Sequence, residues 1–364
     1  MPRRPRDPRL PDAASEGRLD ELRERAASAG VVDAPGVRPA GAPMPLANGV
    51  AGTAGDGNGA SAASGYYGRP LLKEPTWTWE VPLYFFVGGA AGAAAVVGAT
   101  ARAMASDETD LVRDARWVAA LGGALSAPLL ISDLGRPERF LNMLRVWKPQ
   151  SPMSVGAWTL TAFGSSAGAA AFADLVGRRA ADGDSRLAVP VRVVGDAAGM
   201  LAAATGLVMT TYTGVLVGAT TIPAWNRSVS VLPIHFAASG LGAAVSLLEL
   251  LGHDHPALNR LGIAAALAEI GTGVVHELDG DPAHAPLKEG SSGALVRAGG
   301  VLSGPVPLLL RLFGARKAAA VAAIAGSLLT RYGWVAAGRI SARDPSLPLG
   351  LQEPGHHSEG IETP

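Results

Sequence analysis

The sequence predicts an all-α, polytopic membrane protein, a bundle of eight transmembrane helices. Apolar residues fall into repeated runs of about 20, the length a helix needs to cross a hydrocarbon core of ~30 Å. These runs are rich in Gly and Ala, and small residues let helix backbones approach closely in lipid. A charged, proline-punctuated insert separates two of the runs, as expected for a loop at the membrane surface.

Composition excludes several classes of function. The formal net charge is zero, which argues against a nucleic-acid partner. The chain has no cysteine, so disulfides, iron–sulfur clusters, thiolate-bound haem and cysteine nucleophiles are all excluded. Any electron that passes through this protein must therefore come from a partner or from a bound organic cofactor.

Three regions are predicted along the chain: an arm over residues 1–74, a membrane domain over 75–340 and a tail over 341–364. The arm is rich in Pro, Gly, Ala and Arg, with no apolar period beyond a short helix near residues 15–29, so we expect it to be disordered. Its arginines precede no apolar run, which argues against a cleaved signal peptide. The tail is also expected to be disordered.

Eight spans are predicted in the membrane domain. Their ranges are 81–103, 115–132, 154–176, 193–219, 229–251, 258–278, 294–313 and 316–338. The seventh contains Pro305 and Pro307 and has a short uncharged core between Arg297 and Arg311, whose side chains are expected to snorkel to the interfaces. An even number of spans puts both termini on one side, called face A. Basic residues are balanced between the two sets of loops, so the positive-inside rule gives no orientation.

The loop between the second and third spans carries most of the distinctive residues. Residues 132–158 read SDLGRPERFLNMLRVWKPQSPMSVGAW. They place Asp133 at the end of the second span, with Arg136 and Arg139 just beyond it. An amphipathic turn follows and is expected to lie flat on the membrane surface.

This loop resembles the signature of the polysulfide reductase membrane subunit family, also called NrfD-like. Two further segments agree with it: WTWEVPLYFF at 77–86, and YTGVL at 212–216 followed by IPAWN at 222–226. The resemblance covers roughly residues 75–340. It implies a multi-pass subunit of the cell membrane with eight spans, which binds quinone within a multi-subunit oxidoreductase.

Polar groups inside a bilayer are functional candidates because their burial is costly. Glu80, Asp133, Tyr212 and His235, from four predicted helices, fall in the half of the membrane nearest face A. A quinone headgroup site needs hydrogen-bond donors, a titratable group and an apolar slot for the tail. These four residues are therefore predicted to frame such a site beneath the loop.

Each of these residues also has a structural interpretation. Asp133 could pair with an arginine of the loop, and Glu80 could be a plain interfacial carboxylate. Tyr212 and His235 could form ordinary interhelical hydrogen bonds, although the resemblance implies that a tyrosine on this helix belongs to the quinone site. A haem between His235 and His276 is a further alternative, whereas the resemblance implies a haem-free subunit.

A second group of ionisable residues points toward the opposite face. Glu269 is expected near the bilayer midplane, with His276 two turns closer to face A. With Asp196 and Glu249, which are expected to be interfacial, they are candidates for a proton path. Asp133 and Glu269 are the residues predicted to exchange protons.

The sequence thus predicts a membrane-anchor subunit that exchanges electrons between the quinone pool, expected to be menaquinone, and a ferredoxin-like iron–sulfur subunit docked on face A. Arg136 and Arg139 are predicted to dock that partner or to stabilise a quinol anion. A molybdopterin-type catalytic subunit would complete the complex and hold the terminal substrate. No metal site, haem or iron–sulfur cluster is expected in this chain. The alternatives are a secondary transporter with Glu269 as its coupling carboxylate, and a purely structural anchor.

Overall fold

The structure is a computed structural model that describes residues 71–344, apart from 105–108, 135 and 184, together with residue 347. Within these residues the chain is helical and has no strand, which confirms the predicted all-α class. The predicted arm (1–74) lies outside the described residues except for 71–74. The predicted tail (341–364) lies outside them except for 341–344 and 347. The last long helix ends at Arg343, beyond the end of its predicted span at 338.

The helices follow one another with short connections. Their bounds are α2 (Glu80–Met104), α3 (Thr109–Ser132), η2 (Pro137–Leu144), α4 (Pro152–Gly183), α5 (Ser185–Gly218), α6 (Pro223–Asn226), α7 (Leu232–Leu250), α8 (Pro256–Leu278), η3 (Pro282–His284), α9 (Ala285–Lys288), α10 (Gly290–Ser303), α11 (Pro305–Leu312) and α12 (Arg316–Arg343).

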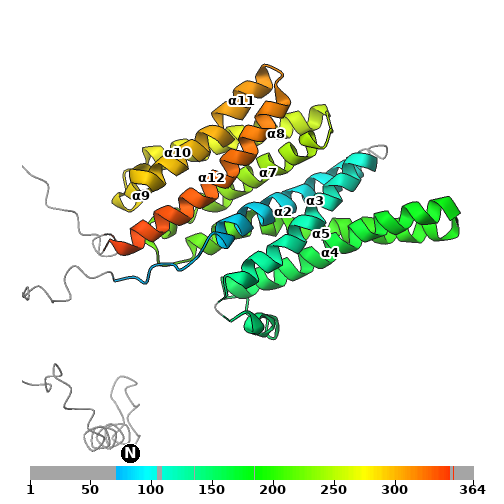
Figure 1. Cartoon of the computed structure of the whole chain (residues 1–364), viewed down its shortest axis with the longest axis horizontal. Coiled ribbons are helices and arrows are strands. Elements are labelled where there is room, and N and C mark those ends of the chain that lie inside the picture. The colour runs from blue at the N-terminus through cyan, green and yellow to red at the C-terminus, as the bar shows by residue number, and fades with distance from the viewer. Residues whose placement is uncertain (1–70, 105–108, 135, 184, 345–346, 348–364) are drawn as a thin grey trace, which may run out of the picture. The chain divides into compact units, whose positions relative to one another are not determined.

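The long helices form two groups (Figure 1). In the first, α2, α3, α4 and α5 pack on one another; in the second, α7 and α8 pack with α10, α11 and α12. Helix α2 joins the groups because it also contacts α7 and α12, and its close approaches use glycine: Gly92 meets Gly206, and Gly89 meets Gly240. The end of the bundle at which α2 begins and α12 ends is face A.

Seven passes of the described chain are long and apolar enough to cross a membrane. Helix α4 is not among them, so the prediction of eight spans is not exact. This helix has ample length and packs between α3 and α5, but Gly, Ser and Thr make up much of its middle and lower its apolarity.

The seventh predicted span is one pass made of two helices. Helix α10 ends at Ser303 and α11 begins at Pro305, with Gly304 between them at φ −107° and ψ −92°. Proline is well tolerated in the first turn of a helix but cannot continue the hydrogen-bond ladder behind it. The break therefore falls where the sequence places Gly-Pro.

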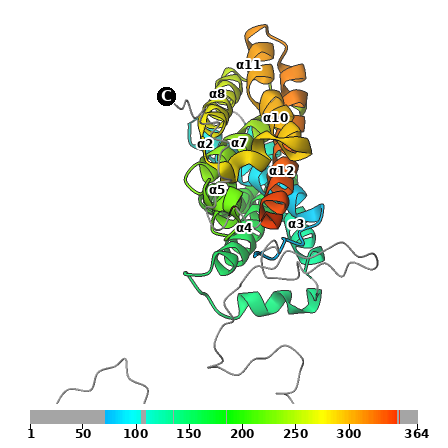
Figure 2. The same cartoon turned by 90° about the vertical axis from the view of Figure 1, so that its left-hand side faces the viewer.

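The loop after α3 forms η2, which lies outside the bundle and contacts α3 and the start of α4 (Figure 2). Its amphipathic turn was predicted, and Leu141 remains 70% exposed while Phe140 is half-buried. An apolar side chain left bare at this position is free to contact lipid or another protein.

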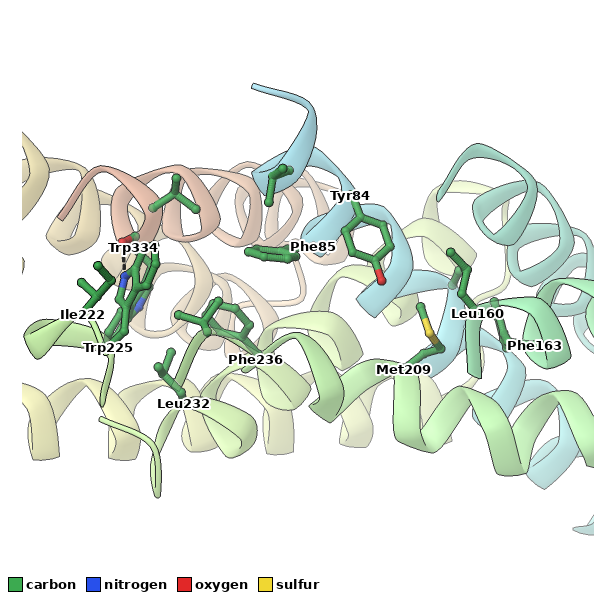
Figure 3. Packing of buried hydrophobic residues seen from close by; sticks show 14 of the residues in the cluster. Tyr84, Phe85, Leu160, Phe163, Met209, Ile222, Trp225, Leu232, Phe236 and Trp334 are labelled. Atoms are coloured by element: carbon green, nitrogen blue, oxygen red, sulfur yellow. Dashed lines mark hydrogen bonds between the residues drawn. The ribbon is translucent and has the colours of Figure 1, made fainter. Parts of the chain in front are cut away.

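A cluster of buried aromatic residues closes face A over the second group of helices. Trp225 of α6 donates a hydrogen bond from Nε1 to the carbonyl of Trp334, 2.8 Å away (Figure 3). Trp77, ahead of α2, stacks on Trp225 with ring centroids 5.0 Å apart. Phe85 and Phe236 extend the cluster toward the middle of the bundle. This packing fixes α12 against α7 and so positions the cavity described next.

Candidate functional site

The larger of two cavities near face A lies between α7, α8, α10 and α12 and has a volume of about 370 Å³. Most of its wall is apolar, and Val274 and Val301, each 50% exposed, lie on one side between α8 and α10 at the outside of the bundle. Its polar lining consists of His235, Glu269 and His276, together with three charged residues, Glu277, Lys288 and Arg297. Pockets of this size and character are typical of sites for small organic ligands.

Glu269 is the buried carboxylate of this cavity, with only 3% of the residue exposed. It shares an inward face of α8 with Ala265, Ala266 and Thr272, at the three- and four-residue spacing of a helix face. Its Oε2 accepts a hydrogen bond from Ser303 Oγ at 2.8 Å, at the break between α10 and α11. Its Oε1 has no partner among the described residues.

His235 lies beside this carboxylate. Its Nδ1 is 2.9 Å from Thr272 Oγ1 and 3.6 Å from Glu269 Oε2. The Thr272 hydroxyl also lies 3.0 Å from the carbonyl of Ala268, four residues back on α8. Either ring nitrogen of His235 can carry the proton, because the Thr272 hydroxyl can accept from Nδ1–H or donate to an Nδ1 lone pair.

His276 completes the polar lining. Its ring centroid is 6.0 Å from that of His235 and 4.9 Å from that of Trp334, so two imidazoles and an indole meet at one end of the cavity. His276 Nε2 and Trp334 Nε1 are buried and have no hydrogen-bond partner in the described part of the chain. With Glu269 Oε1, three unpaired polar atoms belong to side chains around one cavity.

Unpaired buried polar atoms are costly, at roughly 1–3 kcal/mol each. Native proteins contain few of them, and such atoms are usually satisfied by water or by a bound molecule. The three atoms here are one indole donor, one carboxylate acceptor and one imidazole nitrogen that can act as either.

The second cavity lies beneath η2, where the quinone site was predicted, and is much smaller, about 50 Å³. Tyr84, Tyr212, Met143 and Met153 are among its lining residues. The Tyr212 hydroxyl is already used, because it donates a hydrogen bond to the carbonyl of Pro152 at the start of α4. The cavity falls well short of the ~300 Å³ typical of ligand pockets.

Asp133 and Glu80 lie together at the face A end of α2 and α3, joined by Thr78. The backbone N–H of Thr78 donates to Asp133 Oδ1 at 3.2 Å, and its hydroxyl contacts Glu80 Oε2. The ion pair considered between Asp133 and an arginine of the loop does not form. Arg136 and Arg139 are exposed and pair with no carboxylate among the described residues, and Asp133 accepts from Thr78 instead.

The predicted site residues are therefore divided between two places. Glu80, Asp133 and Tyr212 lie under the loop, whereas His235 lies with Glu269 in the other group of helices. The sequence analysis grouped these residues by their expected depth, which does not specify the direction in which each side chain points around its helix. It assigned no role to Ser303, Trp334 or His284, which lie at or next to the larger cavity.

Two ionisable residues predicted to be interfacial are engaged in ion pairs. Glu249 is buried and bound by both terminal nitrogens of Arg311, at 2.6 and 2.8 Å. Both residues were expected at the membrane interface, and both are buried instead. Asp196 is partly buried and accepts from Arg102 and Arg116 at 2.8 and 2.6 Å. Of the two arginines expected to snorkel, only Arg297 is exposed, 3.0 Å from Glu277. The described residues contain no cluster of His, Asp or Glu arranged to hold a metal ion.

The fold is that of a multi-pass helical membrane protein with a cavity near one face. Comparison with protein families gives a match to the NrfD_2 model, described as polysulfide reductase, over residues 63–343. The chain belongs to this polysulfide reductase (NrfD) family, whose members are membrane subunits of multi-subunit oxidoreductases. A comparison with curated proteins gives no match.

Proposed function

We propose that this membrane subunit exchanges electrons between the quinone pool and an iron–sulfur partner, and that the quinone headgroup binds in the 370 Å³ cavity between α7, α8, α10 and α12. The observation that carries the proposal is the set of three unpaired polar atoms around that cavity. A quinone oxidised or reduced there exchanges both electrons with the partner and both protons with nearby side chains.

The polar side chains match the two oxidation states of such a ligand. Trp334 Nε1 is a hydrogen-bond donor only, which suits a carbonyl oxygen. His276 Nε2 can donate or accept, depending on the tautomer. Glu269 Oε1 is placed to accept a hydroxyl proton when the carboxylate is ionised. The side of the cavity at Val274 and Val301, at the outside of the bundle, is where an isoprenoid tail would leave for lipid.

The exposed loop at face A supports the partner's docking. Arg136 and Arg139 on and before η2 project from the bundle without an ion-pair partner among the described residues, and Leu141 is bare beside them. Unpaired guanidinium groups around an exposed apolar side chain are complementary to a partner surface that presents carboxylates around an apolar patch. We propose that a ferredoxin-like iron–sulfur subunit docks there, with a molybdopterin-type subunit beyond it, in a complex of the cell membrane.

The proposal is tested by binding of menadione, a naphthoquinone without a tail, to the purified full chain in detergent. We expect His276→Ala and Trp334→Phe to weaken binding about tenfold each, which corresponds to roughly 1.4 kcal/mol. Tyr212→Phe, in the smaller cavity, is the matched control and should leave binding unchanged. Thermal unfolding of each variant checks that it is folded.

Two results would overturn the proposal. One is loss of menadione binding in Tyr212→Phe with normal binding in His276→Ala, which would place the quinone site in the smaller cavity beneath η2. The other is a purified protein that contains no extractable quinone and binds no menadione. A ubiquinone analogue run in parallel tests the expected preference for menaquinone, and the visible spectrum of the same sample tests the haem alternative.

A secondary transporter remains the second candidate because of one observation. The span formed by α10 and α11 is broken at Gly304, beside Glu269, and broken helices line the substrate sites of many transporters. Reconstituted liposomes distinguish the two functions. A solute gradient driven by protons and abolished by Glu269→Gln would favour transport, whereas quinone-dependent reduction of an added iron–sulfur protein would favour the oxidoreductase subunit.

A further inference from the structure

A line of titratable side chains leads from the larger cavity to the surface at face A. Beyond His276, the next imidazole is His284 of η3, with ring centroids 6.1 Å apart. His284 is 1% exposed, and its Nδ1 lies 3.2 Å from Asp279 Oδ2. The Asp279 side chain is 40% exposed and so contacts water directly.

We propose that Glu269, His235, His276, His284 and Asp279 form a proton relay between the cavity and face A. The inference rests on the proposed function, because it assigns the protons of the quinone reaction to a route. His284 and Asp279 are its outer members, and neither was a candidate on the sequence alone.

The helix geometry places these groups in register. Glu269 and His276 are two turns apart on one face of α8, a rise of about 10 Å, and Asp279 follows at the end of the same helix. His284 is brought back toward α8 by η3, whose first turn is capped by the Asp281 carboxylate accepting from the N–H of Ala283 at 2.9 Å. Ser228 Oγ holds the other side of the His284 ring, 3.0 Å from Nε2.

A purely structural role fits these residues poorly. A buried histidine that only supports packing normally has its ring nitrogens hydrogen-bonded. Here His276 Nε2 has no partner, and His284 Nδ1 lies close to Asp279 without hydrogen-bond geometry. Ring centroids about 6 Å apart put the nitrogens of neighbouring imidazoles within reach of one bridging water or one ring rotation.

Proton transfer along the line is balanced at each step. An imidazole that takes up a proton at one ring nitrogen releases another from its second nitrogen, so each ring returns to its neutral form. One proton that leaves the cavity through Glu269 therefore delivers one proton to water at Asp279, and quinone reduction runs the same steps inward. No net charge remains inside the membrane.

The charges at the outer end favour exchange with water there. Asp281 donates its backbone N–H to Asp279 Oδ1 at 2.9 Å, and this bond, with the nearby His284, holds the pKa of Asp279 below its usual value. Lys288 lies alongside, with Nζ bonded to the carbonyls of Glu277 and Asp279. Asp279 is thus an ionised carboxylate near neutral pH and accepts protons only transiently.

The line does not continue to the opposite face in the described part of the chain. The Ser239 and Ser327 hydroxyls, 2.7 Å apart, lie between α7 and α12. Farther along α7, the next carboxylate is Glu249, which both terminal nitrogens of Arg311 bind. The relay therefore connects the cavity with face A alone.

The test measures hydrogen–deuterium exchange of the Glu269 carboxylic acid by infrared spectroscopy after transfer of the full chain, in detergent, to D₂O. Glu269→Gln identifies the band. We expect His284→Gln to slow its exchange at least tenfold and Asp279→Asn to slow it several-fold. His253→Gln, which replaces an imidazole near the other end of the bundle, is the matched control and should leave the rate unchanged.

Equal rates in the wild type, His284→Gln and Asp279→Asn would overturn the relay. So would the absence of any band removed by Glu269→Gln over the pH range in which the protein is folded, because Glu269 would then never carry a proton. Menadione binding separates this failure from failure of the proposed function. Slowed exchange with no menadione binding would keep the relay and reject the quinone, whereas normal binding with unchanged exchange would do the reverse.

Discussion

Arg311 and Glu249 form a two-fold hydrogen-bonded ion pair inside the membrane domain, with N–O distances of 2.6 and 2.8 Å and side chains only 1% and 3% exposed. It links α11 to α7, with Asn259 of α8 3.3 Å from the same guanidinium. Because Gly262 leaves room for the guanidinium, α8 can pack directly over the pair. Two buried charges are tolerated here because each satisfies the other.

Removal of one partner should destabilise the protein strongly. We expect Arg311→Met to lower the free energy of unfolding by about 3–5 kcal/mol, since it leaves the Glu249 carboxylate buried without a counter-charge. The double variant Arg311→Met/Glu249→Leu should recover much of the loss. Thermal unfolding in detergent measures both, and a double variant less stable than the single one would contradict this account.

A close approach between α12 and α6 gives the second prediction. A Cβ on Gly338 would collide with the indole of Trp225, which stacks on Trp77 and donates to the Trp334 carbonyl. Gly338→Ala should therefore displace Trp225 and cost roughly 1–3 kcal/mol, the usual penalty of overpacking.

The control for this substitution is Gly164→Ala in α4, where an added Cβ has no neighbour within 4 Å. It should leave the melting temperature nearly unchanged. Tryptophan fluorescence sums over the seven tryptophans of the chain, so a change at Trp225 is measured as the difference between the variant and wild-type spectra. An unchanged emission spectrum in Gly338→Ala would show that the two helices separate without strain and that the contact is unimportant.

The sequence was sufficient to predict the class of fold because apolar run length and polar loops depend on local composition. All eight predicted spans overlap observed helices, but α4 was overestimated as a membrane span because its Gly, Ser and Thr were counted within an apolar run. The break at Gly304 lay within a span already marked by Pro305 and Pro307.

The site was harder to predict, for a geometric reason. His235 and Tyr212 were expected at similar depths from face A, so the sequence analysis placed them together. Helix α7, however, turns His235 toward α8 and Glu269, and α5 turns Tyr212 toward α4. That direction depends on which helices are neighbours, which a single sequence does not specify. In the sequence, His235, His276 and His284 are far apart, and only the fold shows that their rings follow one another in space.

Acid should weaken the ion pair between Glu74, which precedes α2, and Arg343 at the end of the last helix. Arg343 binds the Glu74 carboxylate at 2.8 and 2.9 Å, and this bonding lowers the pKa of Glu74 below its usual value of about 4.5. A carboxyl whose pKa is lower in the folded state adds stability above its unfolded pKa and loses that contribution as the pH falls through its folded pKa.

The difference in melting temperature between the wild type and Glu74→Gln should thus be present at neutral pH and disappear below the folded pKa of Glu74. Both groups are exposed, so the difference is expected to be small and to shrink further at high salt. A difference that grows as the pH falls would show that Glu74 is stabilised in its protonated form instead.

The last prediction concerns Tyr212, whose role separates the two cavities. Its hydroxyl donates to the Pro152 carbonyl, and a Cβ at Gly156 would meet its ring, so the tyrosine fits closely against the start of α4. Tyr212→Phe removes one hydrogen bond, which should cost about 1 kcal/mol. Because the start of α4 carries η2 on its outer side, the same change should also loosen the loop that bears Arg136 and Arg139.

We therefore expect Tyr212→Phe to weaken binding of the iron–sulfur partner a few-fold while menadione binding stays normal. Co-purification of the partner, measured beside menadione titration, checks both halves, and a variant that loses menadione but keeps the partner would place the quinone under the loop.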